Sequence, residues 1–404
     1  MHDPDHLLFL GRTNWRDRVK PFGIHAGDRM AHLYVIGQTG TGKTTLLQNL
    51  IWQDLKRGHG LAFLDPHGDA VEDLVRRFPP ERRDDLVYLD VTDPNLTLGF
   101  NPLENVPVQY RALAASGIIE AFKNVWDTTW GPRLEHILRN ALLCLLDQPE
   151  ATLADIPRLF ADKEYREAAI ERLTHPATRD FWLKEFAAYP YRYRIEALAP
   201  VQNKLGAFLA QPPLYRLLTR PRAGYRLRDI MDNRRVFLVN LSKGKIGADG
   251  AALLGSLIVS RLGLAGVSRT NVPEEGRMPF YVYLDEFHTF TTLSIAGMLS
   301  ELRKYRVGLI LAHQYVFQLD EEVKHAVLGN VGTLVCFRVG PEDARILGSQ
   351  FAPEFEELDL SNLPNHSCYV RLLVHGEVAR PFSATTLEPL WKPASGYAEG
   401  RRAA

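Results

Sequence analysis

The sequence has few cysteines and no excess of either charge. Its three cysteines, Cys144, Cys336 and Cys368, stand too far apart for a CxxC pair or for the ligand spacing of a metal site. This scarcity excludes a disulfide-stapled scaffold and favours a reducing, cytoplasmic compartment. The 48 Lys and Arg residues balance the 48 Asp and Glu residues, which excludes a uniformly basic nucleic-acid coat but permits a local basic face.

Long hydrophobic runs are also missing. The longest, Ala251 to Ser260, ends at Arg261, whereas a membrane-spanning helix needs about 20 apolar residues. The apolar run from Leu7 to Leu10 is too short for a signal peptide. We therefore expect no transmembrane segment in this chain, and a protein that is cytoplasmic or held at the inner face of the membrane by its partners.

The sequence does contain the alternation of buried strands and helices that is typical of a parallel sheet. Residues 33–36 and 61–64 are continuous apolar runs, as in strands covered on both faces, and residues 44–56 between them have helical spacing of apolar residues. Further strands are predicted at residues 86–89, 235–239, 280–284, 307–312, 333–339 and 369–373. This pattern predicts an α/β fold around a mostly parallel central sheet.

One long segment interrupts this alternation. From residue 107 to residue 226 the sequence has almost no strand signal, many helical stretches and frequent prolines. We therefore predict four parts: the first half of an α/β domain (1–105), an inserted all-α domain (106–226), the second half of the α/β domain (227–392) and a flexible tail (393–404).

A glycine-rich segment, GQTGTGKT at residues 37–44, matches the pattern GxxxxGK[ST]. Glycines let the backbone curl so that its N–H groups point at phosphate oxygens, and the helix that follows adds the positive end of its dipole. Lys43 would bring a charge to the β- and γ-phosphates of ATP, and the Thr44 hydroxyl would bind Mg²⁺. The predicted nucleotide-binding residues are Gly37, Thr39, Gly40, Thr41, Gly42, Lys43, Thr44 and Thr45.

A second candidate site is the apolar strand at 280–284, which ends in Asp285 and Glu286. Acids at the carboxyl edge of a parallel sheet face the crevice where ligands bind. We expect Asp285 to hold Mg²⁺, together with Thr44, and Glu286 to orient or deprotonate the attacking water. Gln314, after the strand at 307–312, is positioned to sense the γ-phosphate. The alternative, a merely solvated strand end, is less favoured because the phosphate loop is present.

Other polar residues have two interpretations each. Asp65, after the strand at 61–64, either approaches the metal or caps the Pro-Gly turn that follows it. Arg29, before the first strand, is either a second phosphate contact or a structural residue. Lys243 and Lys245, after the strand at 235–239, are candidates to line a central pore.

These motifs resemble those of the coupling-protein ATPases of type IV secretion and conjugation, within the wider group of hexameric DNA pumps that includes FtsK and HerA. The matching segments are residues 37–45, 64–69, 99–103, 239–244, 284–287, 303–305 and 312–314. The resemblance implies a RecA-like P-loop NTPase that uses ATP and Mg²⁺. It also implies an all-α domain between the phosphate loop and the acidic strand. Typical coupling proteins begin with transmembrane helices, and this chain departs from them because none is predicted in it.

The resemblance further implies a residue that acts on a neighbouring subunit. In the family, an arginine just before the strand that leads to Gln314 reaches the neighbour's nucleotide. Arg303 is the best match and Arg306 the second, whereas an ordinary charged surface helix is the alternative. An arginine finger in trans implies a ring, which we expect to be a homohexamer.

Residues 187–235 carry ten basic and three acidic residues, a local charge of +7 in a neutral chain. Within them, residues 189–194 alternate tyrosine rings with guanidinium groups. Rings stack on bases and arginines pair with phosphates, so this stretch predicts sequence-independent DNA binding. The alternative is a solvated basic helix face.

The sequence thus predicts an ATP-driven ring that moves DNA or nucleoprotein, with a secretion-system membrane protein or a relaxase as candidate partners. Two alternatives stay open. One is a HerA-like DNA translocase of repair or phage defence. The other is a nucleotide-gated scaffold that docks substrates at a secretion channel and hydrolyses ATP slowly.

Overall fold

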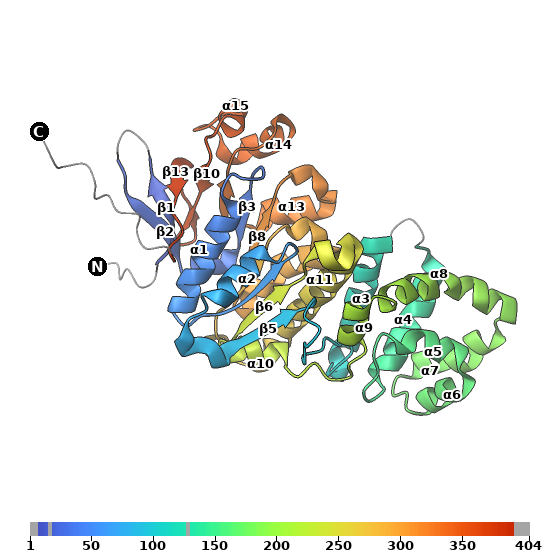
Figure 1. Cartoon of the computed structure of the whole chain (residues 1–404). Coiled ribbons are helices and arrows are strands. Elements are labelled where there is room, and N and C mark those ends of the chain that lie inside the picture. The colour runs from blue at the N-terminus through green and yellow to red at the C-terminus, as the bar shows by residue number, and fades with distance from the viewer. Residues whose placement is uncertain (1–6, 15–17, 127–129, 392–404) are drawn as a thin grey trace, which may run out of the picture.

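The computed structural model describes residues 7–14, 18–126 and 130–391 of the chain. An eleven-stranded mixed sheet forms the body of the molecule, and most of the helices between β5 and β6 lie to one side of it (Figure 1). The strand order is β2-β1-β13-β10-β9-β3-β8-β7-β4-β6-β5.

The strands from β9 to β5 in this order pair in parallel, as the sequence predicts. They are β3 (Leu33–Ile36), β4 (Gly60–Asp65), β5 (Leu86–Asp90), β6 (Val236–Asn240), β7 (Phe280–Leu284), β8 (Val307–His313) and β9 (Thr333–Cys336). Every residue of β3, β4, β6, β7, β8 and β9 is buried, which explains their continuous apolar sequences.

The other end of the sheet is antiparallel, which the sequence patterns did not predict. It consists of β1 (Leu7–Thr13), β2 (Pro21–His25), β10 (Ser367–Arg371) and β13 (Phe382–Thr386). A separate ribbon joins β11 (Leu373–Val374) and β12 (Glu377–Val378). The strand predicted at 333–339 ends earlier, at Cys336, and the one predicted at 369–373 lies two residues earlier along the chain.

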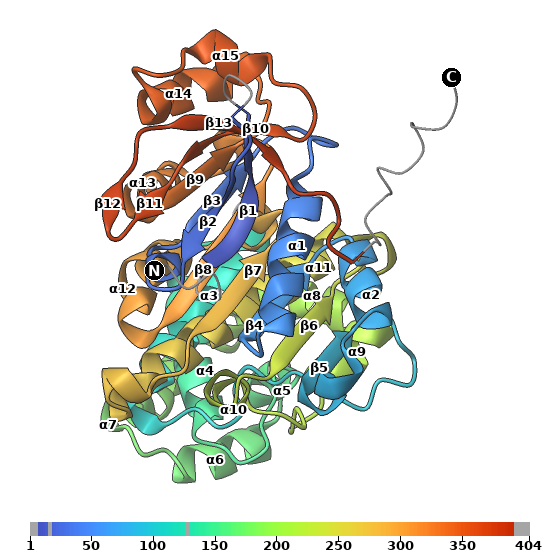
Figure 2. The same ribbon diagram turned by 90° about the vertical axis from the view of Figure 1, so that its left-hand side faces the viewer.

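Helices cover both faces of the sheet (Figure 2). On one face, α1 (Lys43–Lys56) and α2 (Asp69–Arg76) pack against alternate strand residues such as Val35 and Phe63. On the other face, α3 (Arg111–Trp126) and α11 (Lys243–Val267) pack against Tyr34 and Ile36. The two-residue period of a strand thus divides the core into two clusters.

Between β5 and β6 the described chain forms helices and no strand. These helices are α3, α4 (Pro132–Leu146), α5 (Asp155–Ala161), α6 (Lys163–Glu171), α7 (Pro176–Asp180), α8 (Tyr191–Leu209), α9 (Pro212–Leu218) and α10 (Leu227–Asp232), with a π-helical stretch at Phe181–Phe186. Local signals start some of them: Pro132 occupies the first turn of α4, and the Asp162 carboxylate caps α6 by accepting from the Tyr165 N–H. Of the remaining helices, α12 (Leu293–Glu301) follows β7, α13 (Glu321–Asn330) follows β8, and α14 (Pro341–Phe351) and α15 (Glu357–Ser361) follow β9.

The central helix α11 is bent at Gly247, whose φ is +77°. Together with the turn that follows it, the helix is long and apolar enough to cross a bilayer by length and composition. However, 78% of its most apolar window is buried inside the fold, as expected of a core helix that packs against α3 and the sheet. Among the described residues it is the one helix that passes this test.

Arg29 lies inside this core and not at the phosphate loop. Its side chain donates from both terminal nitrogens to the two oxygens of Asp54, each at 2.7 Å, and lies 3.3 Å from the ring centroid of Tyr281. Because the residue is only 6% exposed and precedes β3, whereas the phosphate loop follows it, the interpretation of Arg29 as a phosphate contact is wrong. Its role is to join α1 to the sheet.

We predict that Asp54→Asn destabilises the protein by about 3–5 kcal/mol at neutral pH, because it leaves the buried Arg29 charge unpaired. Burial alone would raise the pKa of Asp54, but the charge of Arg29 and hydrogen bonds from His59 and Arg29 bring this pKa down to about 2. The contribution of the pair is therefore complete above the usual pKa near 4, and it is lost as the pH falls toward about 2.

Urea unfolding at pH 7 and at pH 3 measures this effect. The difference in the free energy of unfolding between wild type and variant should be smaller at the lower pH. Asp73→Asn is the control, because it removes only the surface ion pairs with Arg76 and Arg77, each worth less than about 1 kcal/mol. Equal losses from the two substitutions would contradict the assignment.

Candidate functional site

The phosphate loop lies between the end of β3 and the start of α1, at the carboxyl edge of the parallel strands. Its backbone needs glycine at several positions, among them Gly40, whose φ is +78°. Gly42 has a φ of +116°, a conformation that other residues rarely adopt, and a Cβ on Gly37 would lie 2.5 Å from the Cβ of Phe337. The loop therefore keeps the curled shape that the sequence pattern predicts for residues 37–45.

Lys43, the first residue of α1, points into this curl. Its Nζ donates to the carbonyl oxygens of Gly37, at 2.5 Å, and Gln38, at 3.1 Å. Burial lowers the pKa of Lys43, while the nearby carboxylates of Glu286 and Asp285 act in the opposite direction. The ammonium group is thus held inside the loop, opposite the acidic strand end.

The two predicted magnesium ligands contact each other directly. Thr44 Oγ1 donates to Asp285 Oδ2 across 3.1 Å, which connects the start of α1 to the end of β7. Burial, with added repulsion from Asp65 and Glu286, raises the pKa of Asp285 to about 6. Among the described residues no group of three or more His, Cys, Asp or Glu side chains could hold a metal ion. Magnesium in phosphate sites instead uses a hydroxyl, one or two carboxylates, substrate phosphates and water, and Thr44 with Asp285 fits that donor set.

Gln314 connects the phosphate loop to Glu286. Its Nε2 donates to Glu286 Oε1 at 2.6 Å, and its Oε1 accepts from the Thr39 hydroxyl at 2.8 Å. Glu286 has a left-handed backbone, with φ at +46°, and its Oε2 is buried without a hydrogen-bond partner; His288 Nδ1 lies 3.4 Å from it. Strained backbone and an unpartnered carboxylate oxygen are features that concentrate at functional sites.

Asp65 caps the turn that follows β4. Its carboxylate accepts from the backbone N–H groups of His67, Ala70 and Val71, at 2.8, 2.9 and 3.2 Å. This geometry supports the interpretation of Asp65 as a turn cap. The residue also lies close enough to Asp285 to raise its pKa.

These groups surround a cavity of about 400 Å³. Besides Asp65, four of its lining residues are absent from the sequence-predicted site: His67, Asp69, Ala70 and His366. The backbone N–H of His366 donates to the Thr41 carbonyl at 2.9 Å, which fixes the residue against the loop from the turn before β10. No local pattern marks it, because only the fold brings it near residue 41. A larger cavity, of about 600 Å³, lies where the helical segment meets α11 and contains none of the predicted site residues.

Arg303 lies at the opposite edge of the sheet from this cavity. It belongs to the 3₁₀ turn Leu302–Tyr305, which precedes β8, whereas Gln314 follows β8. The seven residues of β8 span about 23 Å. This distance separates Arg303 from the site of its own subunit. The exposed Arg303 side chain forms no hydrogen bond or ion pair with the part of the chain that the structure describes.

The basic stretch 187–235 uses much of its charge within the chain. Arg194 donates to the carbonyls of Ala187 and Tyr189, Arg220 donates to those of Leu96 and Thr97, and Arg222 pairs with Glu150. The side chains of Tyr191 and Tyr193 lie outside the described part of the structure. DNA binding by this stretch therefore stays a prediction.

The candidate pore lysines, Lys243 and Lys245, are exposed at the start of α11. That helix follows β6, so they lie at the same edge of the sheet as the phosphate loop, and Lys245 Nζ donates to the Thr92 hydroxyl at 3.3 Å. Their contact with DNA also stays a prediction.

We predict that Asp285→Asn stabilises the protein when nucleotide and Mg²⁺ are withheld. Because the folded state holds the Asp285 proton more tightly than the unfolded chain, stability falls as the pH rises toward and through about 6, by up to about 3 kcal/mol. An asparagine removes this cost. The melting temperature of the Asp285→Asn variant should therefore exceed that of wild type at pH 8 but converge with it near pH 4.

Thermal melts at the two pH values measure the difference. The control is Asp69→Asn, an exposed cavity-lining residue that should change stability little at either pH. A lower melting temperature for Asp285→Asn at pH 8 would contradict the electrostatic account.

The chain resembles several known proteins. The family model described as "Helicase HerA, central domain" matches residues 10–250, a span that includes the phosphate loop. No protein of curated function matches the sequence. The fold of this chain aligns with that of the unbound bacterial conjugative coupling protein TrwBdeltaN70. The alignment has a TM-score of 0.65 and 17% identity, over 94% of this chain and 89% of that one.

Two further solved structures have the same fold. TrwB in complex with ADP and Mg²⁺ aligns with a TM-score of 0.64 and 17% identity, over 90% of this chain and 87% of that one. VirB4 of Thermoanaerobacter pseudethanolicus aligns with a TM-score of 0.64 and 16% identity, over 96% of this chain and 98% of that one. The predicted RecA-like P-loop NTPase fold is therefore confirmed. Because the family model matches more than half of the chain, this protein belongs to the HerA central-domain family.

Proposed function

We propose that this protein is a Mg²⁺-dependent ATPase that assembles as a ring of six subunits and moves DNA or nucleoprotein through its centre. One observation carries the ATPase assignment: the phosphate loop and the acidic strand end are joined by direct contacts, Thr44 to Asp285 and Thr39 through Gln314 to Glu286. The relatives support it, because TrwB structures are described with ADP and Mg²⁺ and with nucleotide analogues.

In this proposal each side chain has a distinct task. Lys43 and the loop N–H groups bind the phosphates, and Thr44 and Asp285 hold Mg²⁺, which supplies charge neutralisation when bound. Glu286 orients the attacking water with its unpartnered Oε2 and accepts the proton. Gln314, already bonded to Glu286, reports whether a γ-phosphate occupies the site.

The position of Arg303 supports the ring. The residue is exposed and lies about 23 Å from the site of its own chain, so we propose that it neutralises the γ-phosphate bound by the next subunit. A ring also creates a central channel, and Lys243 and Lys245 at the start of α11 are the residues that we propose to line it. A relaxase or a secretion-system membrane protein is then the candidate partner of the ring.

A second candidate is a HerA-like translocase of repair or phage defence. The family model favours it, because the model that matches residues 10–250 is described as the central domain of helicase HerA. Co-purification with a nuclease would support this candidate, and co-purification with a secretion-system membrane protein would support the first.

The central test is the ATPase rate with and without single- and double-stranded DNA, read beside the mass in solution. We predict that DNA raises the rate, and that Glu286→Gln binds ATP with wild-type affinity but hydrolyses it at least about 100-fold more slowly, because it cannot accept the proton. Lys43→Ala should lose nucleotide binding altogether. Normal turnover by Glu286→Gln would refute the role of Glu286, and a rate that is indifferent to DNA would favour a docking scaffold over a motor.

Mixing two inactive variants tests the finger in trans. Arg303→Ala should lower the rate by about 10³-fold or more and leave ATP binding intact. In an equal mixture with Lys43→Ala, an intact finger meets an intact phosphate loop at about one interface in four of a randomly assembled ring, so activity should return toward that fraction. If the mixture stays inactive although mixed rings form, the finger does not act in trans.

A further inference from the structure

Each backbone carbonyl from Arg303 to Arg306 accepts a hydrogen bond. We call residues 302–306 the finger loop. Its carbonyls at positions 303 and 306 accept from the backbone N–H groups of Arg306, at 3.1 Å, and Phe280, at 3.0 Å. The Lys304 carbonyl accepts from the guanidinium of Arg277, and the Tyr305 carbonyl accepts from Arg269 Nη1 at 2.9 Å. Two of the four bonds thus come from charged side chains outside the loop.

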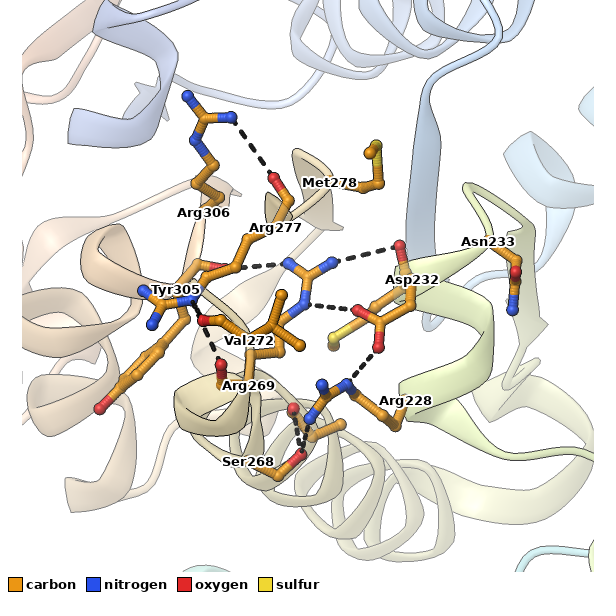
Figure 3. A network of polar contacts seen from close by, with 12 residues as sticks. Arg228, Asp232, Asn233, Ser268, Arg269, Val272, Arg277, Met278, Tyr305 and Arg306 are labelled. Atoms are coloured by element: carbon orange, nitrogen blue, oxygen red, sulfur yellow. Dashed lines mark hydrogen bonds and ion pairs between the residues drawn. The ribbon is translucent and has the colours of Figure 1, made fainter. Parts of the chain in front are cut away.

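The two arginines that hold the loop are themselves fixed (Figure 3). Arg269 has a fully buried side chain, and its Nε donates to Asp232 Oδ1 at 2.9 Å. Arg277 Nε donates to the Val272 carbonyl at 2.9 Å, and Arg306 Nη1 donates back to the Arg277 carbonyl at 3.4 Å. The loop and its supports therefore hold each other in place.

Burying the charge of Arg269 costs stability, and we look for a geometric reason for it. Burial lowers the pKa of Arg269, which shows the penalty of placing its charge in the core, and the ion pair with Asp232 offsets it. An apolar side chain would fill the same volume without that penalty. What an apolar side chain cannot do is bind a carbonyl in a defined direction, which guanidinium groups do through strong charge-assisted hydrogen bonds.

The contrast with Arg303 itself is informative. The backbone on both sides of Arg303 is held, yet its side chain is exposed and has no hydrogen-bond or ion-pair partner among the described residues. A firmly held backbone that presents a free functional group is the pattern of a preorganised catalytic element.

We propose that Arg269 and Arg277 are positioning residues that hold the finger loop, so that Arg303 meets the nucleotide of the neighbouring subunit without further ordering. This inference rests on the proposed function of Arg303 as a trans-acting finger. Within the network of Figure 3, it assigns to Arg269 and Arg277 a part in the rate of hydrolysis that goes beyond the stability of the fold.

Arg277 is the residue to test, because it is only partly buried and its loss exposes the Lys304 carbonyl to water. We predict that Arg277→Ala lowers kcat by about 10- to 100-fold, since small misplacements of a catalytic group have effects of this size, and leaves the affinity for ATP unchanged. In the Arg303→Ala background the same substitution should have no further effect on kcat. Arg277→Lys should recover part of the rate, because a lysine still donates to the Lys304 carbonyl.

Arg228→Ala is the matched control. Arg228 belongs to the same network and binds Asp232, Ser268 and Asn271, but it contacts no carbonyl of the finger loop. Its removal should leave kcat at the wild-type level. Melting temperatures of all variants are measured in parallel, and if Arg277→Ala does not fold, the comparison is made between Arg277→Lys and Arg228→Ala.

The outcomes separate the two proposals. If Arg303→Ala lowers kcat but Arg277→Ala does not, or if Arg277→Ala lowers kcat equally with and without Arg303, the positioning role is refuted and the finger stands. If Arg303→Ala itself has normal kcat, the finger is refuted and the positioning role fails with it.

Discussion

The carboxyl ends of four neighbouring parallel strands meet at one edge of the sheet, and the candidate site depends on this constraint. In the order β3-β8-β7-β4, the chain continues into the phosphate loop, Gln314, Asp285 with Glu286, and Asp65. The register pairs Leu64 with Leu284 and Leu284 with Leu311, so the polar residues that follow these strands are brought level. Hydrogen bonds of the sheet backbone thus place groups that are up to 275 residues apart, such as Thr39 and Gln314, within contact distance.

This placement concentrates negative charge where little water reaches it. Asp65, Asp285 and Glu286 are each at most 6% exposed, and only Asp65 has its charge spread over three backbone N–H groups. The raised pKa of Asp285 and the unpartnered Oε2 of Glu286 are the consequences. Stability is given up here, as is common where side chains must interact with a ligand instead of with each other. The opposite solution is found at Arg29 and Asp54, where every charge is paired and the role is structural.

Local patterns were sufficient for the parallel strands and for the phosphate loop, because both are encoded by neighbouring residues: apolar runs such as Leu33–Ile36 and glycines at fixed spacing. They also placed Asp285, Glu286 and Gln314, since each directly follows a buried strand. Tertiary partners were out of reach. Asp54 looks like an ordinary polar residue of α1 until the fold brings Arg29 to it, and His366 meets the phosphate loop only through the turn before β10. The antiparallel strands could not be predicted for a similar reason. The alternating run in β1 is short, and it becomes a strand by pairing with β2 and β13.

Strand β8 has a consequence for any assembled ring. One end of this fully buried strand contacts the glutamate of its own subunit through Gln314, and the other end follows directly on the turn that would present Arg303 to the next subunit. The β8 strands of successive subunits would then connect all the nucleotide pockets around the ring. Nucleotide binding in one pocket would shift a single strand slightly along its axis, and this shift would change the neighbouring pocket. Hydrolysis could then proceed in sequence around the ring without any large movement of the helical segment.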